Sequence, residues 1–129
     1  LEKLDELLAK SSPREILENF YLMNSVLHIL QVSIQALIDM ACHLIGELGE
    51  KPPSTYSETA IVLNKIKILE GEEAKLMQKI IGFRNIVVHS YASLSLSLIE
   101  EILKNKKYMD ILRLAEKLLL YAKNKNIDC

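Results

Sequence analysis

The side chains best suited to chemistry stand together in one segment, Gly82-Phe83-Arg84-Asn85-Ile86-Val87-Val88-His89-Ser90-Tyr91. Arg84 is permanently charged and can grip a phosphate with two parallel N–H donors. His89 titrates near neutral pH and can accept or release a proton. RNA carries its own nucleophile, the 2′-hydroxyl, so cleavage of its phosphodiester bond needs only proton transfer and stabilisation of an anionic transition state. The pair therefore matches phosphodiester chemistry in kind, although such a step commonly uses both an acid and a base.

The spacing of these residues predicts a helix over 72–89 that presents them beside an apolar stripe. Asn85 and His89 are four residues apart and share one face, while Arg84 and Tyr91 are seven apart and nearly eclipsed. We expect this flank to line a groove or a helix pair, although polar contacts between buried helices could also use all four residues. The stripe itself predicts the buried face of the helix, formed by Leu76, Ile80, Phe83 and Val87.

A second helix offers Asp39 and His43, again four residues apart. They form either a hydrogen bond within the helix, a pair that lines a groove, or a support for the Arg84 segment. His28 is predicted to be structural or solvent-facing, and it lies eleven residues from Asp39, without the spacing of a metal site. Nucleotide-binding glycine loops and Cys-x-x-Cys pairs are absent from the sequence. We therefore expect no metal and no other cofactor.

The elements that must position these residues are predicted to be helices. Of 129 residues, 50% are hydrophobic and only four are Gly and three Pro, so little interrupts helical periodicity. We predict one domain over 1–129, an all-α antiparallel bundle of four to five helices. The expected helical segments are 1–10, 13–48 (continuous or bent near 21–25), 57–69, 72–89, 98–103 and 108–124.

The charge distribution limits the partners of the protein. The formal net charge is −1, which argues against broad coating of a polyanion, but residues 104–129 carry seven bases and three acids. An anionic partner would therefore meet a local basic surface. The apolar run 26–45 is interrupted by polar residues, and the N-terminus lacks a secretory pattern. We expect a cytoplasmic protein without a membrane segment.

The motif Arg84-Asn85-x-x-x-His89-x-Tyr91 resembles the Arg-x4-His-x-Tyr motif of the HepT-like ribonuclease toxins, a branch of the HEPN superfamily. The segments 30–43, 53–56 and 82–85 also resemble that family, so the likeness covers roughly residues 25–105. Gln35 departs from the pattern, because many relatives have an acid there.

The resemblance implies a HEPN-like bundle that forms a homodimer with the motif at the dimer interface. It also implies a metal-independent RNA endonuclease, the toxin of a type VII-like toxin–antitoxin system. The partner would be an MntA-type nucleotidyltransferase antitoxin, which neutralises the toxin by AMP transfer to the motif tyrosine. The residue roles implied are phosphate binding for Arg84, proton transfer for His89, ordering of the motif for Asn85, AMP acceptance for Tyr91, and support from Asp39 and His43.

A two-fold interface would bring a second His89 and a second Arg84 to one site, and so supply both an acid and a base. The alternative is a non-catalytic helical subunit that docks a nucleotidyltransferase or its substrate.

Overall fold

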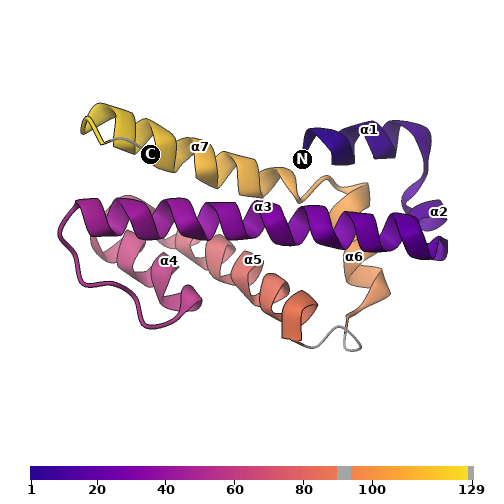
Figure 1. The fold of residues 1–129 in the computed structure, drawn as a ribbon, viewed down its shortest axis with the longest axis horizontal. Helices are drawn as coiled ribbons and strands as arrows, with labels where there is room; N and C mark the ends of the chain where they lie inside the picture. The colour runs from indigo at the N-terminus through magenta and orange to yellow at the C-terminus, as the bar shows by residue number, and fades with distance from the viewer. Residues whose placement is uncertain (90–93, 128–129) are drawn as a thin grey trace.

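The computed structural model describes residues 1–89 and 94–127, and all regular structure in these ranges is helical (Figure 1). The predicted all-α fold is therefore confirmed. In chain order, the described helices are α1 (Glu2–Lys10), α2 (Pro13–Glu18), α3 (Phe20–Glu47), α4 (Tyr56–Lys65), α5 (Gly71–His89), α6 (Leu96–Lys104) and α7 (Met109–Asn124).

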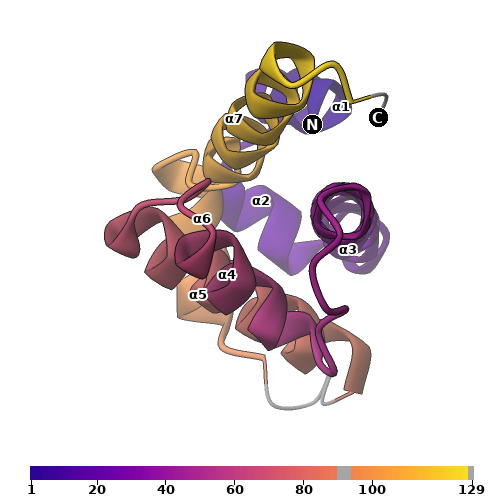
Figure 2. The ribbon, with the colours of Figure 1, turned by 90° about the vertical axis from the view of Figure 1, so that its left-hand side faces the viewer.

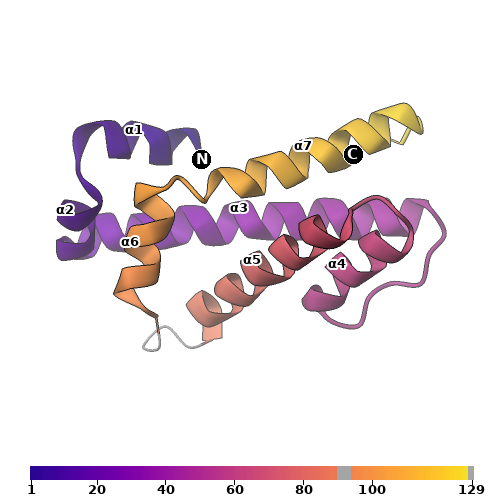
Figure 3. The same cartoon turned by 180° about the vertical axis from the view of Figure 1, so that it is seen from behind.

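Helix α3 is the axis on which the other helices pack. Viewed from its C-terminal end, α3, α7 and the α4–α5 pair stand around a common core (Figure 2). Seen from behind, α4 and α5 lie side by side and α6 crosses near the N-terminal end of α3 (Figure 3). At that end α1 turns back toward the start of α7, where the buried Tyr108 hydroxyl donates to Asp5.

The burial of α3 follows from its composition. Ten of its residues are buried, and they recur at helical spacing from Met23 to Ile45. The helix is long and apolar enough to cross a membrane by length and composition, but a core helix meets the same criteria. In this fold the buried face of α3 packs against α2, α4, α5 and α7.

Two helices begin at other positions than predicted, because side chains cap them. The break in the segment 13–48 falls at Asn19, before the bend expected near 21–25. Asn19 has an extended backbone, and its side chain accepts a hydrogen bond from the Leu22 N–H at 3.0 Å, so α3 starts at Phe20. Ser95 likewise caps α6, which starts at Leu96 rather than at residue 98.

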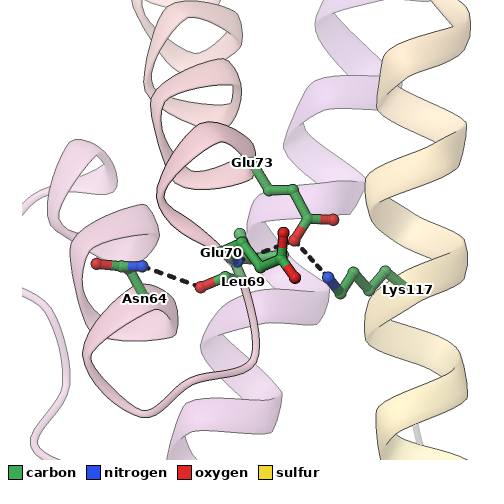
Figure 4. Close-up of polar contacts among 5 residues, drawn as sticks. All are labelled: Asn64, Leu69, Glu70, Glu73 and Lys117. Carbon is green, nitrogen blue, oxygen red and sulfur yellow. Dashed lines mark hydrogen bonds and ion pairs between the residues drawn. The ribbon is translucent and has the colours of Figure 1, made fainter.

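The helix expected over 57–69 ends at Lys65. Lys67 adopts a positive φ of 65°, so the chain turns there while the following apolar side chains, Ile68 and Leu69, remain buried. The Asn64 side chain donates to the Leu69 carbonyl at 3.0 Å and closes this turn (Figure 4). Burial of residues 68 and 69 therefore comes from the turn and not from helical periodicity.

The buried stripe of α5 is rotated from the one predicted. Its buried residues are Ala74, Met77, Ile81 and Val87. Of the predicted stripe, only Val87 is buried, while Leu76, Ile80 and Phe83 are half-buried and line a cavity of about 420 Å³ shared with α3, α6 and α7. The rotation reflects packing mainly on α3 and α4, with α7 also in contact, and these helices together cover a wider face than one stripe.

An ion pair fixes the N-terminal end of α5 against α7. The Lys117 ammonium donates to the Glu73 carboxylate, which also accepts from the Glu70 N–H at 2.9 Å (Figure 4). Partial burial disfavours the charged form of Glu73, but the hydrogen bonds from Lys117 and Glu70 and the charge of Lys117 outweigh it, so the pKa of Glu73 is lowered. This contact sets where α5 lies along the bundle, and α5 carries Arg84 about three turns further on.

Glu73→Gln should lower the free energy of unfolding by about 1 kcal/mol at neutral pH, because it removes a partly buried charge-assisted contact. A carboxylate with a lowered pKa stabilises the fold above its unfolded-state pKa and loses that contribution as the pH falls through its folded-state pKa. The difference from wild type should therefore shrink below about pH 4.5. Urea unfolding at pH 7 and pH 4 measures both values.

The matched control is Glu72→Gln, one residue earlier in the same first turn. The Glu72 side chain is 93% exposed, and its Oε1 lies 4.0 Å from Lys75 Nζ, at the outer limit of an ion pair. It shares the helix-dipole contribution of Glu73 but not the contact with α7. Equal losses in the two variants would show that Lys117 contributes nothing.

Candidate active site around Arg84

Three helices meet at the Arg84 guanidinium, which is half-buried on α5. Its Nη2 donates to Gln35 Oε1 of α3 at 2.7 Å, and its Nη1 donates to the neighbouring Asn85 Oδ1 at 3.3 Å. Its Cζ lies 5.0 Å from the ring centroid of Tyr56, the first residue of α4. Within the described ranges, Arg84 forms no ion pair. The guanidinium is thus held by neutral groups alone.

The Gln35 amide links Arg84 to an acid on α3. Gln35 Nε2 donates to Asp39 Oδ1 at 2.9 Å, while Gln35 Oε1 accepts from Arg84. Only one orientation of the amide satisfies both neighbours, since an arginine has only donors and an ionised carboxylate only acceptors. Asp39, Gln35 and Arg84 therefore form a directional hydrogen-bonded chain across the interface of α3 and α5.

A buried N–H donor of Arg84 makes no hydrogen bond to the described residues. This donor is the Nε atom of the guanidinium. A buried donor without a partner costs stability, and natural proteins accept such costs mainly at functional sites. The arrangement therefore favours a ligand-binding role for Arg84 over a purely structural one.

His89 is the last residue of α5 and is exposed, one turn beyond the half-buried Asn85. His89 lies five positions after Arg84 on the helix, which places them about 7.5 Å apart along the axis and about 140° apart around it. Within one chain the two side chains therefore leave α5 in diverging directions. Tyr91 lies outside the described residues, and its predicted place beside Arg84 stays a prediction.

The residues predicted on α3 have different places relative to the site. Asp39 is exposed and reaches the site through Gln35. His43 is exposed one turn further along α3, and His28 is exposed nearly three turns before Asp39. Over residues 1–89 and 94–127, no three His, Cys, Asp or Glu side chains are grouped so as to hold a metal ion.

Two residues of the site, Gln35 and Tyr56, were not predicted as site residues. Gln35 could have been proposed from its position one turn before Asp39 on the same helix face. Tyr56 follows the proline loop at the start of α4, and nothing in its local sequence indicates contact with Arg84. Both contacts depend on how α3 and α4 pack against α5.

The fold and this site define a helical-bundle protein whose half-buried arginine and exposed histidine lie on the same helix. The family model of the ribonuclease HepT-like proteins matches residues 1–118, and the chain belongs to this family. The family resemblance noted in the sequence is thereby confirmed.

Two relatives illustrate the range of the family. The chain is 24% identical over 101 residues to the mRNA nuclease HepT of Shewanella oneidensis, covering 74% of this chain and 76% of that protein. It is 28% identical over 79 residues to a protein of Archaeoglobus fulgidus, and the match spans 61% of this chain but only 59% of that relative.

A solved structure supports the fold. The tri-AMPylated Shewanella oneidensis HEPN toxin, in complex with an MNT antitoxin, superposes with a TM-score of 0.81 at 21% identity. The superposition covers 92% of this chain and 87% of that one. At this level of identity, the likeness establishes a shared helical-bundle fold.

Arg84→Met should change the free energy of unfolding by no more than about 1 kcal/mol, because it removes a buried unpaired donor along with two hydrogen bonds. Ile81→Ala, at a fully buried position one turn earlier on α5, should lose about 2–5 kcal/mol. Urea unfolding compares the two. A loss from Arg84→Met as large as that from Ile81→Ala would identify Arg84 as a structural residue.

Proposed function

We propose that this protein is the toxin of a HepT/MntA-type pair, a metal-independent RNA endonuclease that acts in the cytoplasm through Arg84 and His89. One observation carries the proposal: the Arg84 guanidinium is held by neutral partners, on the helix that ends at the exposed His89, in a chain of the ribonuclease HepT-like family. An arginine whose charge is not neutralised by the protein is suited to an RNA phosphate. The relative named as an mRNA nuclease supports the same substrate class.

In the proposed reaction, Arg84 binds the non-bridging oxygens of the scissile phosphate. His89 removes the proton of the 2′-hydroxyl, the O2′–P bond forms and the P–O5′ bond breaks. The 5′ oxygen leaves with a proton from a second acid. The products are a 2′,3′-cyclic phosphate and a 5′-hydroxyl, and the internal nucleophile makes a metal-activated water unnecessary. Asn85 would order the motif by its contact with Arg84.

We infer that the second acid comes from a second copy of the chain. His89 and Arg84 diverge along α5, so one chain offers a single proton-transfer group at some distance from its phosphate-binding group. A two-fold homodimer that pairs the C-terminal ends of α5 would bring two of each into one cleft. The formal net charge of −1 is compatible with such a site, because RNA would bind to the local positive charge of the cleft. RNA binding should therefore weaken as the salt concentration rises.

The partner we propose is an MntA-type nucleotidyltransferase, which would transfer AMP to Tyr91. The structural neighbour is itself AMPylated and bound to an MNT antitoxin. An AMP group on Tyr91 would place a phosphate next to Arg84, offset its charge and fill the RNA site. His43 and Asp39 would support the site from α3.

The purified protein should cleave RNA in the presence of EDTA and leave 2′,3′-cyclic phosphate ends. Arg84→Ala and His89→Ala should each lower the rate by at least about 100-fold, because they remove phosphate binding and proton transfer. Gel analysis of a labelled RNA measures the rate, and His28→Ala, an exposed histidine elsewhere on α3, is the control. Intact RNA with folded wild-type protein would favour the docking-subunit alternative.

The homodimer is tested in the same assay by mixing wild-type chains with an excess of His89→Ala chains. If the acid and the base are the His89 side chains of two copies, each mixed dimer keeps only one of them, so the activity per wild-type chain should fall as subunits exchange. A site contained in one chain would keep its activity per wild-type chain.

Co-expression with its nucleotidyltransferase partner should add an AMP-sized mass to the peptide that contains Tyr91 and abolish RNA cleavage. Tyr91→Phe should still cleave RNA and escape inactivation, because AMP transfer needs the phenol oxygen. Peptide mass spectrometry locates the adduct. Modification instead at Tyr56, whose ring lies 5.0 Å from the Arg84 guanidinium, would contradict the assignment.

A further inference from the structure

The arginine of the site is oriented across the helix interface by a residue that carries no charge. Gln35 lies 49 residues before Arg84, and its amide oxygen makes the shortest hydrogen bond of the guanidinium, at 2.7 Å. The other two neighbours, Asn85 and the Tyr56 ring, are also neutral. The full positive charge of Arg84 is therefore not offset by any described residue in direct contact.

The side-chain amide of Gln35 separates Arg84 from the acid Asp39. Asp39 accepts a hydrogen bond from Gln35 Nε2 at 2.9 Å and is itself exposed. Its contact fixes the amide with the oxygen toward Arg84, since the reverse orientation would set donor against donor and acceptor against acceptor. Asp39 thus orients Arg84 through Gln35 without forming an ion pair with it.

A carboxylate at position 35 would meet the guanidinium in the same geometry. It would form a charge-assisted pair, which is shorter and roughly twice as strong as a neutral hydrogen bond. An incoming phosphate would then compete with that carboxylate for Arg84. The amide supplies the orientation without this competition.

We propose that Gln35 is a positioning residue that, oriented by Asp39, holds Arg84 in place and keeps its charge available to the RNA phosphodiester. The RNA part rests on the proposed function, whereas the Gln35–Arg84 contact and its effect on charge do not. Gln35 acts through Arg84 and is not itself a catalytic residue.

The charge effect is tested without RNA by a double-mutant cycle on stability. Gln35→Glu should raise the urea midpoint of unfolding when Arg84 is present, because an ion pair forms. In an Arg84→Met background the same change should lower the midpoint, because the new carboxylate then stands one turn from Asp39 with no cation between them. This reversal of sign is the expected result.

The control variant is Gln78→Glu. It makes the same change of composition and net charge, at a half-buried position on α5 instead of α3. It should shift the midpoint equally in both backgrounds. If Gln35→Glu also shifts the midpoint equally in both, Gln35 does not act on the charge of Arg84 and the inference is overturned.

The functional effect is tested by binding of a 2′-O-methyl RNA oligonucleotide, which cannot be cleaved, over a range of salt concentrations. Gln35→Glu should weaken binding by about tenfold at low salt, and the slope of log K against log salt should fall by about 0.7 for each Arg84 in contact. Gln78→Glu should keep the wild-type slope. A merely structural role for Gln35 would weaken binding without changing this slope, which would contradict the proposal.

The two assays separate the failure of each proposal. Absence of RNA binding by the wild-type protein, together with the reversal of sign in the stability cycle, would overturn the RNA function while confirming that Gln35 leaves Arg84 without a counter-charge. A wild-type protein that binds RNA, with no reversal of sign, would retain the RNA function and overturn the role of Gln35.

Discussion

The burial of α3 along one face is the constraint on which the rest of the structure depends. Its fully buried residues, such as Ile34 and Ile38, alternate with partly exposed positions such as Gln35 and Asp39. The helical repeat that presses one set into the core turns the other set toward α5 and solvent. The polar path to Arg84 is therefore a consequence of how the core helix is buried.

The site shows a conflict between folding and function. A fold selected for stability alone would pair the Arg84 guanidinium with an acid or replace it with an apolar side chain, because its buried Nε has no described partner. The surrounding contacts orient the arginine but do not neutralise it. The stable contacts lie elsewhere, as in the pair of Glu73 and Lys117 that anchors α5 on α7. One end of α5 is thus anchored on α7, while the other end carries Arg84 and His89.

Sequence patterns predicted the helices well where the signal was local. The predicted helix start at residue 13 is confirmed, and a capping box between Ser12 and Glu15 fixes it. The prediction misplaced the start of α3 at Phe20 and the end of α4 at Lys65, because an asparagine cap and a lysine with positive φ are weak signals in sequence. The buried face of α5 was misassigned because its packing on several helices was not visible in one stripe.

Local sequence patterns specified the helical class, the placement of Arg84, Asn85 and His89 on one helix, and the family resemblance. These properties depend on neighbours within a few turns, where helical periodicity fixes geometry. The contacts in which Gln35 orients Arg84 and the Tyr56 ring covers it became visible in the folded structure alone. Such contacts join segments far apart in the chain, and the packing of α3, α4 and α5 that creates them is set by the whole core rather than by any local pattern.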